Sequence, residues 1–239
     1  MLFLKSLLYF LGASLALIIL VTIALLLFFL PLKMRYKILV NWAKFCIFWL
    51  RITLNIKLKV IGIENIPKTS CVIICNHQST WEVIGLQTIF PQQTWVLKRE
   101  LLLIPVFGWG LAMLKPIVIN RGKKLEALKK ILKQGTARIA DGIFVVIFPE
   151  GTRQPYGQLG DYQKGGVSIA KKAGVCISPV YHNAGRVWPK GNFTKYPGTV
   201  TVIIGAPISS AEKSANELIK EVKDWTEKAA KSIKNIAES

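Results

Sequence analysis

Acidic residues and cysteines are scarce in this sequence of 239 residues. Only 13 Asp and Glu accompany 32 Lys and Arg, so the formal net charge is +19. Such an excess predicts an anionic partner, which could be a phospholipid, a nucleic acid, a phosphorylated substrate or an acidic protein. Four cysteines form no dense disulfide framework of the kind found in small secreted domains, and we expect reduced thiols facing a cytosol.

Several common signatures are also missing. The sequence contains no internal repeat, no low-complexity linker and no G-x-x-x-x-G-K-[ST] run, which excludes a phosphate-binding P-loop. Cys71, Cys75 and His77 match no common zinc spacing, so we predict no metal site. Hydrophobic residues make up 51% of the chain, which argues against intrinsic disorder and predicts one compact domain with a short appendage.

The N-terminal segment is a long uncharged run. No charged residue occurs from Ser6 to Leu32, between Lys5 and Lys33. A membrane span needs about 20 apolar residues, so the run is long enough to cross a bilayer. A cleaved signal peptide is the alternative, but its apolar region would be shorter and no A-x-A-like site precedes Lys33. The basic residues after the run favour a cytoplasmic location for the following domain.

A second helix is predicted over residues 35–51. Lys37, Asn41, Lys44 and Arg51 fall on one narrow stripe of that helix, and the rest of its surface is apolar and rich in tryptophan. This pattern fits a helix at the headgroup boundary of a bilayer, and a core helix beneath the domain is the alternative. We therefore predict a membrane anchor over residues 1–55 and an α/β domain over residues 56–239.

From residue 56 onward, short β-branched runs alternate with helical patterns, which is typical of an α/β domain with a mainly parallel sheet. Seven strands are expected, at 56–62, 71–75, 94–98, 116–119, 143–148, 176–181 and 199–205. Helices are expected near 80–90, 123–139, 162–173 and 210–236. The pair Ser209 and Glu212 fits a capping box at the start of the last helix.

The residues with chemical potential follow the predicted strands, where α/β sheets place their sites. His77 comes directly after the strand at 71–75, and a histidine with its ordinary pKa of about 6.5 is the usual general base. Glu82 can orient the imidazole if His77 lies in the turn before a helix and Glu82 in its first turn. The alternative role for Glu82 is a capping box with Ser79, and the alternative for His77 is a hydrogen-bonded turn histidine.

Basic residues and a second loop lie at the ends of other strands. The run FPEGTR at 148–153 follows a buried strand, and a loop with free N–H groups and one Arg is suited to hold an anion. Lys98 with Arg99 and Arg121 follow two further strands. Convergence of these clusters on one edge of the sheet predicts a phosphate pocket. A salt-bridged turn and solvated surface charges are the alternatives.

Four segments together resemble a known family. NHQSTWE at 76–82, INR at 119–121, FPEGTR at 148–153 and ISPV at 177–180 are similar, in this order, to the four blocks of the glycerolipid acyltransferases, in particular the bacterial 1-acyl-glycerol-3-phosphate acyltransferases. The resemblance covers roughly residues 60–210, and the pairing of the first and third blocks is its most specific part. The acid of the first block is more often Asp in that family, whereas this chain has Glu82.

The resemblance implies roles for individual residues. His77 would be the general base and Glu82 its orienting acid. Six further residues would contact the substrate and its phosphate: Lys98, Arg121, Glu150, Gly151, Thr152 and Arg153. Backbone N–H groups near 150–152, or near Gly108 and Gly110, are the candidates to stabilise an oxyanion.

The implied reaction transfers a fatty acyl group to the free hydroxyl of 1-acyl-sn-glycerol-3-phosphate (lysophosphatidic acid) and gives phosphatidic acid. Acyl-CoA or acyl-carrier protein would be the co-substrate, with no cofactor and no metal, at a bacterial inner membrane with the catalytic domain on the cytoplasmic face. The alternatives are another acceptor, such as glycerol-3-phosphate or another lysophospholipid, and a non-catalytic protein that binds anionic lipid. Nucleic acid is not an expected partner, because the aromatic residues are not interleaved on a basic face.

Overall fold

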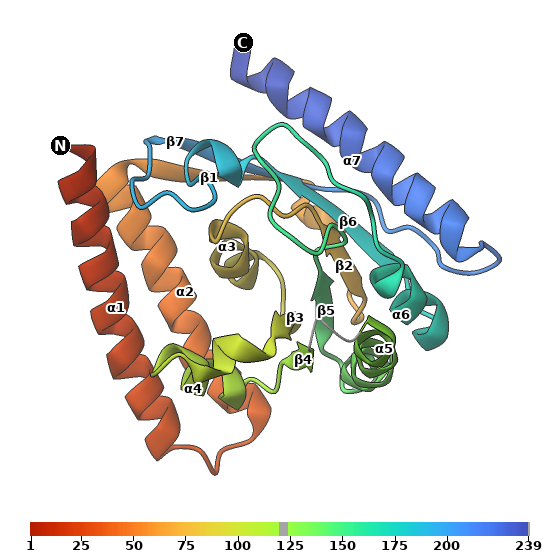
Figure 1. Ribbon diagram of the computed structural model, residues 1–239, viewed down its shortest axis with the longest axis horizontal. Coiled ribbons are helices and arrows are strands. Elements are labelled where there is room, and N and C mark those ends of the chain that lie inside the picture. Colours follow the sequence, from red (N-terminus) through yellow and green to blue (C-terminus); the bar gives the residue numbers. More distant parts are fainter. Residues whose placement is uncertain (120–123, 239) are drawn as a thin grey trace.

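Seven strands form one mixed sheet in the computed structural model, which describes residues 1–119 and 124–238 (Figure 1). The strands are β1 (Ile56–Ile61), β2 (Val72–Cys75), β3 (Gln93–Lys98), β4 (Ile117–Ile119), β5 (Phe144–Ile147), β6 (Ile177–His182) and β7 (Gly198–Ile204). All seven lie within one residue of the predicted runs. The prediction of an α/β fold with a mainly parallel sheet of about seven strands is confirmed.

The order of strands across the sheet is β1-β7-β6-β2-β5-β3-β4. The five strands from β6 to β4 are parallel to one another. Strand β7 runs antiparallel to β6, and β1 pairs with β7 in the parallel direction. In the centre, Ile74 of β2 is paired with Ile147 of β5 and with Pro179 of β6. The carboxyl ends of these three strands therefore lie side by side at one edge of the sheet.

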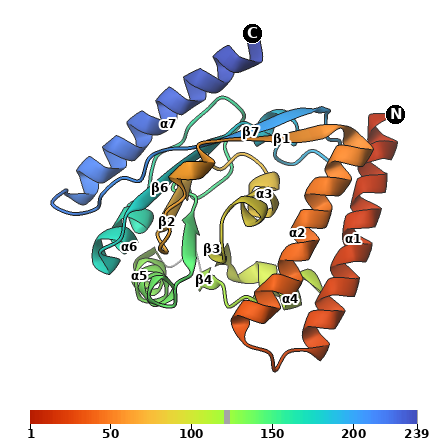
Figure 2. The same ribbon diagram turned by 180° about the vertical axis from the view of Figure 1, so that it is seen from behind.

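Helices cover both faces of the sheet, as Figures 1 and 2 show. One face is covered by α2 and α3 with α1 outside them, and the other by α5, α6 and α7. The helices are α1 (Leu2–Leu26), α2 (Leu32–Leu54), α3 (Trp81–Ile89), α4 (Phe107–Met113), α5 (Lys124–Ala140), α6 (Gly165–Ala173) and α7 (Ala215–Glu238). Short 3-10 turns occur at Ile63–Asn65, Arg99–Leu103 and Ala184–Arg186.

The start of α7 differs from the prediction. The helix begins at Ala215, and its cap is formed by Ser214 and Glu217 rather than by Ser209 and Glu212. The Ser214 N–H donates to Glu217 Oε2 over 2.6 Å, and the Glu217 N–H donates to Ser214 Oγ over 3.2 Å. This segment contains the S-x-x-E pattern twice, at Ser209 and at Ser214. The first copy lies outside the helix, because the chain before it is still paired with β6 through Ile208.

The two N-terminal helices pack against each other along their lengths (Figure 2). Trp42 Nε1 donates to the carbonyl of Ala13 over 2.8 Å, and Trp49 Nε1 donates to the carbonyl of Leu8 over 3.2 Å. Gly12 allows this approach, since a Cβ there would lie 2.4 Å from the Trp49 ring nitrogen. One helix among the described residues, Leu2–Leu26, is long and apolar enough to cross a membrane.

The second helix packs as a core helix, which was one of the two alternatives that its sequence left open. Its buried side joins the hydrophobic core beneath the sheet through Leu39, Ala43, Cys46 and Leu50. The predicted polar stripe of Lys37, Asn41, Lys44 and Arg51 is exposed on another side. The helix is thus a core helix that also presents a basic surface.

A buried lysine connects α1 to the loop that follows β6. The Lys195 N–H donates to Ser6 Oγ over 3.0 Å, and Lys195 Nζ lies 3.6 Å from the centroid of the Phe10 ring and 4.3 Å from that of Trp188. Burial lowers the pKa of Lys195 to about 8, so the side chain remains an ammonium group at neutral pH. Ring faces attract such a cation. Helix α1 is therefore attached to the α/β domain through a specific polar contact as well as through apolar packing.

Candidate active site

Three loops meet at the carboxyl edge of the central strands. They follow β2, β5 and β6, and hydrogen bonds connect them to one another. The Gln154 N–H of the second loop donates to the His77 carbonyl of the first over 2.7 Å. The Ser79 hydroxyl of the first loop donates to the Trp188 carbonyl of the third over 2.7 Å. The site is therefore built from segments that are far apart in the sequence.

His77 lies in the turn between β2 and α3, and its imidazole contacts Glu82. The bond joins His77 Nδ1 to Glu82 Oε1. The ring stacks on Phe148, with centroids 4.4 Å apart and 14° between the planes, and 16% of the side chain is exposed. Within the described ranges, no hydrogen bond to His77 Nε2 is present. Because Nδ1–H is donated to the carboxylate, Nε2 is the ring nitrogen that can accept a proton.

Glu82 is fully buried in the first turn of α3. Its Oε1 also accepts the Gln78 N–H over 3.2 Å, and its Oε2 accepts the Ser79 N–H over 2.8 Å. The helix-capping role and the imidazole-binding role, which the sequence left as alternatives, are thus combined in one side chain. Burial by itself raises the pKa of Glu82, but His182 and His77 outweigh it, so the pKa lies below its ordinary value and the group is a carboxylate at neutral pH.

The loop after β5 places Glu150 and Arg153 next to this pair. Gly151 has a φ of +68°, which favours glycine, and its N–H donates to the Phe148 carbonyl over 3.1 Å. Burial raises the pKa of Glu150 to about 8, and the negative charge of Glu82 raises it further, against the effect of nearby backbone N–H groups. A neutral carboxyl group therefore predominates there at pH 7.

Arg153 is held at the start of α3. Its Nη1 donates to Thr80 Oγ1 over 2.9 Å, while Lys190 Nζ, from the loop after β6, donates to the Arg153 carbonyl over 3.0 Å. Thr152 is exposed between Gly151 and Arg153. A guanidinium and an ammonium group thus occur on the same side of the sheet as the imidazole, which is an arrangement that can bind a phosphate.

The other predicted residues are Lys98, Arg121, Gly108 and Gly110. Lys98 is exposed at the end of β3. Its strand is separated from β2 by β5, roughly 10 Å across the sheet by strand spacing. Arg121 lies outside the described residues. The N–H groups of Gly108 and Gly110 donate to carbonyls at Ile104 and Val106, so the expectation that they could stabilise an oxyanion is wrong. The Gly151 N–H is also engaged within its own turn.

Two residues of this region were not predicted from the sequence. His182, the last residue of β6, is fully buried and lies 3.2 Å from Glu82 through its Nε2. It ends an apolar strand, and nothing in its local sequence indicates a polar contact. Lys190 lies in a loop that no pattern singled out. In both cases the partner is distant in the sequence, so local spacing carries no signal.

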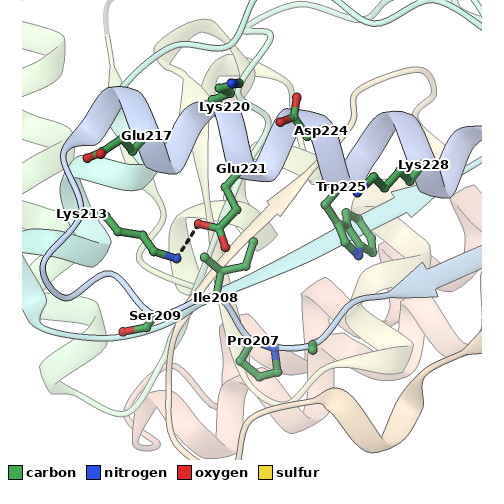
Figure 3. A pocket seen from close by; sticks show the side chains of 11 residues that line it. Pro207, Ile208, Ser209, Lys213, Glu217, Lys220, Glu221, Asp224, Trp225 and Lys228 are labelled. Atoms are coloured by element: carbon green, nitrogen blue, oxygen red, sulfur yellow. Dashed lines mark hydrogen bonds and ion pairs between the residues drawn. The ribbon is translucent and has the colours of Figure 1, made fainter.

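A groove of about 690 Å³ lies elsewhere, between α7 and the chain that follows β7 (Figure 3). Figure 3 shows Trp225, Lys220 and Glu221 on the helix above Pro207 and Ile208. Lys213 and Glu221 form an ion pair of 2.7 Å there. None of the predicted site residues lines this groove, so it is separate from the candidate active site.

Comparisons with known proteins agree with the geometry. The model of the family described as Acyltransferase matches residues 57–183, from β1 to the end of β6. A 1-acyl-sn-glycerol-3-phosphate acyltransferase from Pseudomonas aeruginosa is 47% identical over 199 residues, which cover 83% of this chain and 77% of that protein. The chain belongs to the acyltransferase family.

Other relatives of this acyltransferase support the assignment. A chloroplastic 1-acyl-sn-glycerol-3-phosphate acyltransferase from Brassica napus is 33% identical over 64% of this chain and 45% of its own length. The crystal structure of a 1-acyl-sn-glycerophosphate acyltransferase from Thermotoga maritima aligns with a TM-score of 0.82 and 25% identity, and it covers 97% of this chain and 95% of that one. Because that alignment extends over nearly the whole chain, the likeness includes the N-terminal helices as well as the sheet.

Proposed function

We propose that the chain transfers a fatty acyl group from a thioester, acyl-CoA or acyl-carrier protein, to the free hydroxyl of 1-acyl-sn-glycerol-3-phosphate. The observation that carries this assignment is the contact between His77 and the buried Glu82, beside a loop that bears Arg153. The printed names of the relatives from Pseudomonas aeruginosa and Brassica napus state the same activity. The product is phosphatidic acid, an intermediate of phospholipid synthesis.

In the proposed mechanism, His77 acts as the general base. Its Nε2 accepts the proton of the acceptor hydroxyl while the oxygen attacks the thioester carbonyl. The C–O bond forms, the C–S bond breaks, and the proton passes from His77 to the departing thiolate. General-base assistance of this kind contributes about 10²–10⁴-fold. Glu82 holds the imidazole in the Nδ1–H tautomer and stabilises the imidazolium that forms, because its carboxylate is ionised and fixed by backbone N–H groups.

Arg153 is proposed to bind the phosphate of the acceptor. The Thr80 hydroxyl engages only one of its nitrogens, so further N–H donors remain for phosphate oxygens. Lys190, Thr152 and Lys98 are additional candidates on the same edge of the sheet. The acceptor would reach this edge from a bilayer that is contacted by the exposed apolar side of α1. We further propose the cytoplasmic face of a bacterial inner membrane as the location.

The first test is thiol release from acyl-CoA by the purified protein in detergent or vesicles. Lysophosphatidic acid, glycerol-3-phosphate and an unphosphorylated monoacylglycerol are supplied separately as acceptors. The proposal expects lysophosphatidic acid to be used best. His77→Ala should lose at least about 10²-fold in kcat while its melting temperature and vesicle binding stay close to those of the parent protein. A near-normal rate in this variant would refute the catalytic role.

The second test separates phosphate binding from catalysis. Arg153→Ala should raise KM for lysophosphatidic acid roughly tenfold or more, since a charge-assisted hydrogen bond to phosphate is lost. Arg138→Ala is the matched control, because Arg138 forms an ion pair with Asp141 next to the start of β5, at the opposite edge of the sheet. An unchanged KM in Arg153→Ala, with equal use of an unphosphorylated acceptor, would contradict the phosphate role.

A further inference from the structure

The second histidine of the chain is buried behind the first. His182 has no exposed surface and lies 105 positions after His77, at the end of β6. Its Nε2 lies 3.2 Å from Glu82 Oε2, on the side of the carboxylate that faces away from His77. Glu82 is therefore placed between two imidazoles, one partly open to solvent and one enclosed.

The neighbours of His182 determine which ring nitrogen carries the proton. The Ala184 N–H lies 3.1 Å from Nδ1, and a backbone N–H can only donate, so Nδ1 must accept. The Asn76 carbonyl lies 3.1 Å from Nε2, and a carbonyl can only accept, so Nε2 must carry the proton. His182 thus carries its ring proton on Nε2, which donates to the Asn76 carbonyl and lies 3.2 Å from Glu82 Oε2.

Asn76 fixes the backbone of His182 in this place. Its Nδ2 donates to the His182 carbonyl over 3.0 Å, and its Oδ1 accepts the His182 N–H over 2.9 Å. Asn76 immediately precedes His77, so the same residue connects the two histidine-bearing segments. The Trp81 ring, 6.0 Å away between centroids, packs beside the His182 ring. These contacts leave His182 little freedom to turn away from Glu82.

Four N–H groups consequently surround the carboxylate of Glu82. Oε1 accepts those of His77 and Gln78, Oε2 accepts that of Ser79, and His182 Nε2 lies 3.2 Å from Oε2. The other titratable groups that act on Glu82 or its neighbours here are the Glu150 carboxyl and the Cys75 thiol. Neither donates a hydrogen bond to Glu82 in the structure.

We propose that His182 is a positioning residue, which fixes Glu82 and keeps it ionised so that Glu82 can orient His77. This inference rests on the proposed function of the His77–Glu82 pair. Removal of the His182 ring takes away the polar neighbour of Oε2 and leaves the carboxylate freer to rotate. The tautomer and orientation of His77 are then less well defined in the reaction, although no atom that touches the substrate has changed.

The test compares three variants. His182→Leu removes both ring nitrogens. His182→Gln can replace both, because its amide oxygen can accept the Ala184 N–H and its amide nitrogen can donate to Glu82. Asn183→Ala is the matched control, since it removes a buried hydrogen bond of 2.8 Å to the Thr201 N–H in the same segment without touching Glu82.

His182→Leu should lower kcat roughly 10- to 100-fold, as the loss of a residue that orients a metal ligand does, with little change in KM for lysophosphatidic acid. The acidic limb of its kcat/KM profile should move to higher pH, because the carboxylate loses the adjacent N–H group of His182 and holds the proton that it shares with His77 more tightly. His182→Gln should recover most of kcat and return the acidic limb of the kcat/KM profile to the pH of the parent protein. If His182→Leu shows no shift of the limb and loses no more kcat than Asn183→Ala, the role is only structural and the inference is overturned.

A spectroscopic measurement on the unmutated chain covers the case in which His182→Leu does not fold. The sequence contains only two histidines, so ¹⁵N-histidine labelling gives two side-chain spin systems, and the His77→Ala variant assigns them. The expected result for His182 is a ring protonated on Nε2, with Nδ1 accepting the Ala184 N–H. A cationic or Nδ1–H ring would overturn the inference. An active His77→Ala enzyme would instead refute the proposed function itself.

Discussion

Replacement of Glu82 by Gln tests the core of the site, because it removes a charge without removing volume. Four N–H groups surround the carboxylate, two at each oxygen, and three of them donate hydrogen bonds to it. A glutamine offers one oxygen and one NH₂ group. Whichever way the amide is turned, its NH₂ group faces two N–H groups and can accept from neither.

The magnitude follows from the loss of hydrogen bonds to a charged group and from the clash between N–H donors. Hydrogen bonds to a charged group contribute about 1.5–3 kcal/mol each, so Glu82→Gln should reduce the free energy of unfolding by about 3 kcal/mol or more. For a chain of this size, about 1 kcal/mol corresponds to 2–4 °C, which predicts a melting temperature lower by roughly 6–12 °C. The rate of acyl transfer should fall by about 10³–10⁴-fold, since the imidazole is no longer held in the reactive tautomer.

Thermal unfolding in detergent and thiol release from acyl-CoA measure the two effects. Glu221→Gln is the matched control, because Glu221 forms an exposed ion pair with Lys213 on α7 and should contribute less than about 1 kcal/mol. The reasoning would be refuted if Glu82→Gln melted within about 2 °C of the parent protein and kept its rate within about fivefold.

Two further predictions concern neighbours of this pair. Burial raises the pKa of Glu150 to about 8, so its contribution to stability is full below about pH 4 and is lost as the pH rises through 8. The melting temperature of Glu150→Gln should therefore rise relative to that of the parent protein between about pH 5 and pH 9. Parallel curves of melting temperature against pH for the two proteins would contradict the buried neutral carboxyl group. Gly85→Ala should reduce the free energy of unfolding by about 2 kcal/mol and lower kcat, because its Cβ would lie 2.3 Å from the fully buried Trp81 ring. The control is Gly165→Ala, whose Cβ would have only Ile131 nearby, at 3.9 Å. This control should be close to neutral in the same unfolding and activity assays. Equal melting temperatures for the two glycine variants would show that the Trp81 ring can move aside without loss of stability, and would contradict this prediction.

The sheet could be predicted because each strand is a short, continuous apolar run bounded by polar or turn residues. IFVVIF at 143–148 is typical, and its strand is buried on both faces. Helix α4 was not predicted, because FGWGLAM is short and contains two glycines, which oppose helix formation locally. Tertiary contacts with α1 and α2 compensate for this low propensity.

Only part of the candidate site could be predicted from the sequence. His77 and Glu82 are five positions apart, so a turn followed by a helix brings them together by local geometry alone. His182 and Lys190 could not be found in this way, because their contacts with Glu82 and Arg153 depend on how β6 pairs with β2. Spacing along the chain predicts neighbours within one loop, whereas strand order decides which loops meet.

The attachment of α1 by Lys195 has a consequence for any attempt to shorten the chain. The Trp188 ring lies beside the Lys195 ammonium, and the Trp188 carbonyl accepts the hydroxyl of Ser79, two residues after His77. Deletion of the first helix would therefore uncover a charged group, a cluster of rings and the back of the loop that shapes the reaction centre. An enzyme without its N-terminal helices would thus be a damaged catalyst, and no water-soluble version should be obtainable by simple truncation.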